Sequence, residues 1–425
     1  MFYRFKQAFY LLALFFTYFL LFHFLILQKL NNDFSSFYSA ALAYLDHANP
    51  YQHLSTAFLI KPSPLAVTVN PPFFILLFSP LTAFDYPTAS LLWAISSLIL
   101  GVVGWLLCFY LSTNHSFFKQ NWFNLILIYL ASYACLINTS FNQVAGFLLF
   151  LIMLGYYFLI KQRDYTCGIV WGLAAALKLF PGLFFIFVLV EKRYKIFWTM
   201  STVFILAWFL PLFTRGSEIY LQFFANLSEI IWYGNTWNAS LLAYLFRVFV
   251  DMNHPTNVLM IKIIYQLLFI MILVYYIKKL NQLKNKIHYG FSLSLIIMLL
   301  LSPFGWMYYF ALLLPALILI YQTFAQEETQ RRITIWSICL CLINLPIENI
   351  QARFIPSLFS KLSLSSIYFY GLLMVLALFF YVIKFNPQPL QFKAKSNTGY
   401  LRPIEFILCF SVLVVFATLT KHFQQ

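Results

Sequence analysis

The sequence predicts an all-α polytopic membrane protein. Of its 425 residues, 62% are hydrophobic and only 9% are charged, whereas a soluble domain has about 25% charged residues. Apolar runs recur along the whole chain. Many reach the roughly 18 residues with which a helix can cross a hydrocarbon core of about 30 Å. We therefore expect a bundle of membrane-spanning helices.

The apolar runs predict about eleven to thirteen crossings. By residue number, the expected spans are 8–28, 87–111, 121–138, 143–160, 165–190, 196–213, 258–277, 289–304, 308–323, 333–347, 364–383 and 404–420. A short apolar segment at 71–84 and two polar, aromatic loops at 29–70 and 214–257 lie between them. No small-residue cleavage site follows the first run, so a retained span is favoured over a signal peptide.

Positive charges predict the orientation, because Lys and Arg gather in cytoplasmic loops. Basic groups at 192–195, 278–286, 331–332 and 384–402 mark such loops. With a cytoplasmic N-terminus, both polar loops then face the periplasm or exterior of the inner (plasma) membrane. The exception is "KQRD" at 161–164. Its basic residues are typical of a cytoplasmic loop, but counting the expected spans from the N-terminus places it on the outer side. Either 71–84 or 165–190 is therefore expected to be re-entrant or broken at a proline.

The net charge of +15 fits these cytoplasmic loops, and we expect no nucleic-acid partner. The twelve acidic residues include no Asp-x-Asp pair. Nucleotide-sugar transferases normally use such a pair to hold a divalent metal on the diphosphate. Walker, Gly-x-Ser-x-Gly and His-Glu-x-x-His motifs are also absent. We expect no cofactor and no metal.

Asp33 stands out because it follows the first span directly. One interpretation is a cap on a helix that begins at Phe34, since Asp commonly occupies that position. The other is a carboxylate held in a fixed orientation for chemistry, and the two are compatible. Asp46, near the far end of that helix, is interpreted as a loop or interface residue.

Lys178 lies within an apolar segment, three residues before Pro181. A lysine inside a membrane costs roughly 2.5–3.5 kcal/mol and usually faces a partner or a polar cavity. It either extends to a nearby surface or supplies a cation for an anionic ligand such as a lipid phosphate.

The loop at 214–257 alternates aromatic residues with Asn and Ser, and its apolar part favours an interfacial helix. Aromatic rings and amides suit a sugar, although aromatic belts at membrane interfaces look similar. The junction "SPFGWMYYF" at 302–310 is likewise either an interface anchor or part of a site. Candidate substrate-binding residues are Tyr38, Asn235, Asn238, Trp306, Tyr308 and Tyr309.

In order along the chain, several stretches resemble glycosyltransferase family 87, the polyprenyl-phosphate-sugar-dependent mannosyltransferases of the GT-C superclass. "DFSSFYSAALAYLDHANPY" is similar to the family's opening segment, and "NPPFFILLFSPL" to its Tyr-Pro-Pro-Phe segment. "FNQVAGF" and "LKLFPG" are similar to its Gly-Gln and Lys…Pro elements. "GNTWNASLLAYLFR" and "LLSPFGWMYYFALLLP" are similar to its Gly-Asn-Gln-Ser-Leu element and its Ser-Pro-x-Ser-Trp-x-His-His junction. The resemblance covers roughly residues 30–315, and the shared order is its specific part.

The sequence departs from the family pattern at several positions. The His pair corresponds here to Tyr308 and Tyr309, the Ser before Trp is Gly305, and the Gly-Gln is Asn142-Gln143. A Tyr donates a hydrogen bond but is a poor proton carrier at neutral pH. Either the substrate differs from that of the relatives, or the His pair is less central than the pattern suggests.

The resemblance implies a GT-C-type catalytic core over residues 1–280, with helices of 281–425 completing a donor and acceptor cavity. It implies that Asp33 is the catalytic base of a metal-independent, inverting hexosyltransferase. The donor would be a polyprenyl-phosphate sugar, with mannose the first choice, and the acceptor a lipid or glycan on the outer face. A base alone suffices, because a lipid phosphate leaves without protonation. We expect Lys178 or Arg247, with His254 a weaker candidate, to meet the phosphate charge.

The main alternative is a lipid or glycan flippase or transporter. Such a protein would be expected to show internal repeats or ionisable residues along several spans, and neither pattern is evident. A glycan polymerase or ligase would be expected to use outer-loop Arg and His instead of one Asp. An assembly subunit also remains open.

Overall fold

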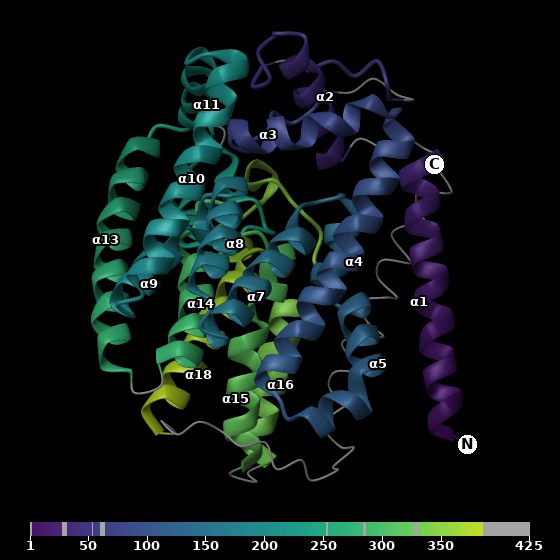
Figure 1. The fold of residues 1–425 in the computed structure, drawn as a ribbon, viewed down its shortest axis with the longest axis vertical. Helices are drawn as coiled ribbons and strands as arrows, with labels where there is room; N and C mark the ends of the chain where they lie inside the picture. Colours follow the sequence, from purple (N-terminus) through teal and green to yellow (C-terminus); the bar gives the residue numbers. More distant parts are fainter. Residues whose placement is uncertain are drawn as a thin grey trace.

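The computed structural model is an all-α polytopic membrane protein, as the sequence predicts. It describes residues 2–27, 32–52, 54–59, 64–251, 254–283, 286–326 and 330–385. Figure 1 shows the long helices running side by side in a bundle, with α2 and α3 at one end of it. The predicted span at 404–420 and the polar linker at 389–400 lie outside the described residues.

The helices that carry most of the chain are α1 (Phe2–Leu27), α2 (Asp33–Leu45), α3 (Pro72–Phe78), α4 (Tyr86–Ser112), α5 (His115–Ala131), α6 (Tyr133–Ser140), α7 (Ala145–Ile160), α8 (Asp164–Leu177), α9 (Leu183–Val190), α10 (Tyr194–Arg215), α11 (Glu218–Glu229), α12 (Leu241–Phe249), α13 (Val258–Gln282), α14 (Phe291–Leu301), α15 (Leu314–Gln326), α16 (Gln330–Asn344), α17 (Leu358–Leu362) and α18 (Ile367–Phe385). Short turns of helix connect them: η1 (Ser79–Ala83), η2 (Phe180–Gly182), η3 (Trp232–Gly234), η4 (Lys286–Gly290), η5 (Met307–Leu313), η6 (Ala352–Phe354) and η7 (Leu364–Ser366).

Within the described ranges, five helical stretches are long and apolar enough to cross a membrane, namely Tyr86–Ser112, Tyr194–Arg215, Val258–Gln282, Met307–Ala325 and Leu358–Phe385. The bent pair α5–α6 raises this number to six if it is one span. Shorter apolar helices occupy several of the other expected positions. The larger number of crossings therefore stays a prediction.

Two expected spans are broken. The segment at 121–138 bends by 56° between α5 and α6. At the bend Ser132 is extended, and its hydroxyl accepts a hydrogen bond from the backbone N–H of Cys135 at 3.3 Å. The segment at 165–190 is interrupted between α8 and α9, where Lys178 leaves helical geometry and Pro181 follows. Proline lacks an N–H and disfavours helical geometry before it, so α8 cannot continue through this point.

The α8–α9 segment returns to the end of the bundle from which it started. Arg193, after α9, forms an ion pair of 2.6 Å with Asp164 at the start of α8. Because Asp164 belongs to "KQRD", that turn and the basic turn at 191–193 lie together. The pair α8–α9 is thus a re-entrant hairpin with Lys178 near its tip, and both basic turns lie at its open end.

Glycines allow α8 to pack closely along α10. A Cβ added to Gly168 would lie 2.8 Å from the carbonyl oxygen of Ile196, and one on Gly172 would lie 2.8 Å from that of Met200. The spacing of four residues places both glycines on one face, as in the small-residue contacts of membrane helices. The contacts advance in the same direction along both helices, so α8 and α10 run parallel.

We expect Gly172→Ala to destabilise the protein, because the added methyl group overpacks this contact. Overpacking a close contact costs roughly 1–3 kcal/mol. The measurement is thermal unfolding of the purified protein in detergent, with Gly182→Ala as the control. A Cβ on Gly182 would have no neighbour within 4 Å. Equal melting temperatures for the two variants would contradict the close α8–α10 packing.

Candidate active site

Asp33 is the first residue of α2, and its side chain is not the cap of that helix. The cap is Asn32, whose side-chain oxygen accepts a hydrogen bond from the backbone N–H of Ser35 at 3.2 Å. The interpretation of Asp33 as the cap is therefore wrong. Its carboxylate remains free for another role and lies at the helix end where the macrodipole favours a negative charge.

The carboxylate of Asp33 accepts a hydrogen bond from the side-chain amide of Gln143. Burial raises the pKa of Asp33, while this hydrogen bond and the positive charge of Lys178 act to lower it. A buried carboxyl with a raised pKa and specific polar partners is typical of a functional site. The net effect raises the pKa of Asp33 above that of an ordinary carboxyl, and the two polar partners limit the rise.

Gln143 lies in the turn between α6 and α7, which a polar network holds in place. Asn142 has a φ of +54°, in the left-handed region that Asn tolerates better than most residues. Its amide donates to the carbonyl and the hydroxyl oxygen of Ser90, both at 2.9 Å. The left-handed backbone at Asn142 is one that glycine also adopts readily, which fits an Asn in place of the family's Gly.

Lys178 lies near the tip of the re-entrant hairpin and is partly buried. The break after α8 brings its ammonium into the electrostatic surroundings of Asp33. The interpretation in which Lys178 merely extends to a surface does not account for this position. A lysine beside a carboxylate inside a membrane protein indicates a site for a charged or polar ligand.

Tyr308 and Tyr309, in η5, complete the surroundings of Asp33. Both hydroxyl groups interact electrostatically with its carboxylate. The Tyr309 ring contacts Phe180 of η2, with ring centroids 4.9 Å apart. Among the described residues, no hydrogen-bond partner of normal geometry meets the buried Tyr309 hydroxyl. It is therefore available to a ligand.

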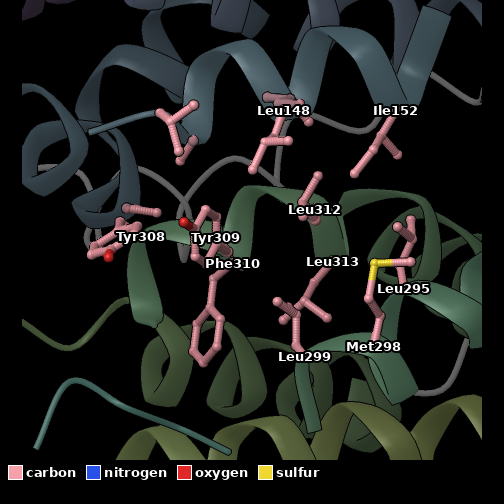
Figure 2. Close-up of a cluster of buried hydrophobic side chains, with 14 of the residues drawn as sticks. Leu148, Ile152, Leu295, Met298, Leu299, Tyr308, Tyr309, Phe310, Leu312 and Leu313 are labelled. Atoms are coloured by element: carbon pink, nitrogen blue, oxygen red, sulfur yellow. The ribbon is translucent and has the colours of Figure 1, made fainter. Parts of the chain in front are cut away.

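Figure 2 shows that both tyrosines lie at the margin of a cluster of buried apolar side chains. Leu148 of α7 and Leu299 of α14 belong to this cluster, and each is fully buried. Protein interiors of this kind are close-packed and resist displacement. The apolar cluster gives the polar groups around Asp33 a rigid support.

The described site thus brings together Asp33, Gln143, Lys178, Tyr308 and Tyr309 from four separate parts of the chain. Four of them are among the residues predicted from the sequence, and Gln143 is not. The signal was present in "FNQVAGF", where an Asn-Gln pair stands between two apolar helices. A carboxylate, an ammonium and several hydroxyl or amide groups can bind a polyol and remove a proton from it.

Trp306 joins the loop at 232–240 to this site. Its backbone pairs with that of Asn238, and its ring stacks at 6.2 Å on that of Tyr308. The amide of Asn238 donates to the carbonyl oxygens of Tyr233 and Pro303 at 3.1 and 2.9 Å. Asn238 therefore holds the loop in shape, and Trp306 is the residue of this pair that stays partly exposed.

The burial and hydrogen bonds of Arg247 favour a structural role over phosphate binding. It is fully buried in α12. It donates to the carbonyl oxygens of Gly234, Asn235 and Asn238 at 2.7–2.9 Å and to the hydroxyl of Ser366 at 2.8 Å. With its donors directed at the loop and at η7, Arg247 is left out of the proposed phosphate site.

Three further candidates, Tyr38, His254 and Asn235, are not among the residues that surround Asp33. The Tyr38 hydroxyl donates to the carbonyl oxygen of Phe84 at 2.8 Å. His254 is exposed in the loop before α13. Asn235 is buried, and its side-chain oxygen has no partner in the described part of the chain. No three His, Cys, Asp or Glu residues in those ranges form a group that could hold a metal ion.

A comparison with family models matches residues 69–303 to glycosyltransferase family 87. This range is more than half of the chain. The chain belongs to glycosyltransferase family 87. Gln143 and Lys178 of this glycosyltransferase lie inside the matched range, whereas Asp33 lies well before it and Tyr308 and Tyr309 shortly after it. No curated protein and no solved structure matches the chain.

Family membership makes the protein a membrane glycosyltransferase, with a sugar donor and an acceptor as its substrates. This agrees with a carboxylate surrounded by hydroxyl and amide groups. The cluster around Asp33 is the candidate active site of the enzyme.

Proposed function

We propose that the protein transfers a hexose, with mannose the first choice, from a polyprenyl-phosphate carrier to a lipid or glycan acceptor. The observation that carries this proposal is the electrostatic interaction of Asp33 with Lys178, which lies near the tip of the re-entrant hairpin. A base and a cation in one site match the two demands of the reaction. One group must take a proton, and another must meet a leaving phosphate.

In the proposed reaction an acceptor hydroxyl attacks the anomeric carbon of the sugar. Its proton passes to the Asp33 carboxylate as the new C–O bond forms. The bond between the anomeric carbon and the phosphate oxygen breaks, and its electron pair leaves with polyprenyl phosphate. Attack opposite the phosphate inverts the anomeric centre. The mechanism needs no metal, because Lys178 meets the phosphate charge.

Several groups are available to the sugar or the acceptor. The Tyr309 hydroxyl and the side-chain oxygen of Gln143 are buried without partners in the described ranges. Unpaired buried polar atoms are costly and occur at functional sites. The partly exposed ring of Trp306 offers a face on which a pyranose can stack. We place the site on the outer side of the inner membrane. The reason is that the basic turns lie at the other end of the bundle, where they match cytoplasmic loops.

The test is reconstitution of the purified protein in liposomes with polyprenyl-phosphate-mannose, other polyprenyl-phosphate hexoses and a panel of glycolipid acceptors. We expect one donor to give a product of inverted anomeric configuration. Failure with every polyprenyl-phosphate sugar, together with transfer from a nucleotide-sugar, would overturn the proposed donor. Carrier movement across the bilayer without transfer would favour a flippase.

We expect Lys178→Met to lower kcat/KM for the donor by about tenfold or more, the size of a lost hydrogen bond to a charged group. The loss should appear mainly as a raised KM for the donor. Removing the positive charge also raises the pKa of Asp33. The acid limb of the pH–rate profile, which is the fall in rate at low pH, should therefore move to higher pH. Lys195→Met, at an exposed position in α10, is the control. A donor KM that is equal in the two variants would contradict the assignment.

A further inference from the structure

Gln143 makes the direct contact with the proposed base. Its amide nitrogen donates to Oδ2 of Asp33, while its own side-chain oxygen is buried without a partner among the described residues. A buried amide held mainly for stability would be expected to use both ends. The side chain of Gln143 is thus directed at Asp33.

The backbone of Gln143 is fixed on several sides. Its N–H donates to the carbonyl oxygen of Asn138 at 2.8 Å, and its carbonyl accepts from the Ser97 hydroxyl at 3.2 Å. The preceding carbonyl, of Asn142, accepts from the indole of Trp93 at 3.0 Å. Asn138 in turn donates from its amide to Ser97 at 3.2 Å. These bonds join the α6–α7 turn to α4 and leave the amide of Gln143 little freedom.

Close packing supports the same turn. A Cβ added to Gly146, in the first turn of α7, would lie 2.0 Å from the carbonyl oxygen of Ser97. Only glycine permits α7 to approach α4 this closely. Further along α7, Leu148 packs into the apolar cluster beside Tyr309 (Figure 2). The start of α7 is therefore anchored on two sides.

We propose that Gln143 is a positioning residue, which orients the carboxylate of Asp33 so that Oδ1 faces the acceptor hydroxyl. In the described ranges Oδ1 has no hydrogen-bond donor of its own. A carboxylate held through one oxygen loses rotational freedom, and the other oxygen then points in one direction. This inference rests on the proposed function, because it assigns Asp33 as the base of the transfer.

The hydrogen bond from Gln143 affects how the rate depends on pH. The charged and titratable groups that face Asp33 are Lys178 from the hairpin tip and Tyr308 and Tyr309 from η5. The hydrogen bond from Gln143 opposes the burial that raises the pKa of Asp33. Without it that pKa rises further, and the base is lost at a higher pH than in the wild type.

The experiment compares wild type with Gln143→Leu and Gln143→Glu, measuring kcat and KM for donor and acceptor across pH. Leu removes the donor at similar size, and Glu places a second carboxylate against Asp33. We expect kcat at neutral pH to fall by about tenfold or more, with each KM changed by less than about twofold. The acid limb should move to higher pH in both variants, and activity should recover as pH rises. Gln120→Leu, on the exposed side of α5, is the matched control.

A structural defect would lower kcat at every pH without moving the acid limb, and that result would overturn the inference. A raised KM with an unmoved acid limb would also overturn it, because Gln143 would then bind substrate instead of positioning Asp33. Thermal unfolding in detergent identifies a variant that has lost its fold. For such a variant Gln143→Asn, which keeps the amide but shortens it, takes its place.

A readout without substrate separates this inference from the proposed function. Dicyclohexylcarbodiimide reacts with protonated carboxyl groups in apolar surroundings, and mass spectrometry measures the labelled fraction of Asp33 at each pH. We expect the midpoint of labelling to move to higher pH in Gln143→Leu. An unmoved midpoint in an active enzyme overturns the positioning role alone. A moved midpoint in a protein that transfers no polyprenyl-phosphate sugar overturns the proposed donor alone.

Discussion

Asp33→Asn should lower the rate of sugar transfer by about 10²–10⁴-fold, the usual contribution of a general base. The amide has nearly the same shape as the carboxylate but cannot take the acceptor proton. Because Asn32 caps α2, the substitution removes no cap, and the melting temperature should change little. The measurement is single-turnover transfer with donor and acceptor at saturation.

The matched control is Asp46→Asn, which changes the exposed Asp at the other end of the same helix. We expect this variant to keep wild-type activity. In the wild type the base must be ionised, so activity falls as pH drops through the pKa of Asp33. Burial raises that pKa, and the fall should begin above the range of an ordinary carboxyl. Equal rates for Asp33→Asn and wild type would remove Asp33 as the base.

Arg247→Met should destabilise the protein by at least about 3 kcal/mol. The substitution leaves three buried carbonyl oxygens and the Ser366 hydroxyl without their donor, and each unsatisfied group costs roughly 1–3 kcal/mol. It also releases the loop at 232–240 from α12 and from η7. Thermal unfolding in detergent measures the effect, and Arg247→Lys should be intermediate, because one ammonium cannot replace the planar fork.

Arg353→Met is the control for this experiment, since Arg353 is exposed and rests on the Phe354 ring at 4.6 Å. Its melting temperature should match that of the wild type. A structural role of Arg247 predicts a loss of stability, whereas a phosphate-binding role predicts a raised donor KM at normal stability. A normally stable Arg247→Met protein with a selectively raised donor KM would restore Arg247 as a phosphate ligand.

The sequence alone was enough to predict the fold class, and it singled out Asp33 and Lys178, which interact electrostatically in the structure. Asp33 and Lys178 could be picked out because charged residues are rare in this chain. A charged residue beside or within an apolar run is costly and therefore indicates a specific role. Their proximity in space could not be predicted, since it depends on the return of α8–α9 to its starting end. That return is visible in the structure through the Asp164–Arg193 ion pair and the packing of Gly168 against α10.

Residue type was a poorer guide in the loop at 214–257. Arg247 and Asn238 carry groups that suit a phosphate and a sugar, yet backbone carbonyls already occupy their donors. A sequence does not show which polar side chains a loop uses to hold its own backbone. Gln143 was missed for the opposite reason, because a neutral amide in a short turn looks like an ordinary loop residue.

The break at Ser132 was also missed, because an apolar segment long enough to cross suggests one straight helix. Ser132 caps α6 with its hydroxyl, but a single serine within an apolar run is common. The break at Lys178 had a clearer signal in Pro181. Local sequence thus gave the break at proline as one of two alternatives, and it gave no sign of the break that a side-chain cap permits.

The most direct test is a structure of the protein bound to a polyprenyl-phosphonate analogue of the sugar donor, which cannot lose its leaving group. We expect the phosphonate within hydrogen-bond reach of the Lys178 ammonium. The anomeric carbon should lie on the side facing the Asp33 carboxylate, with the lipid chain leading into the membrane. A sugar bound away from Asp33, with the phosphonate held by residues other than Lys178, would contradict this expectation.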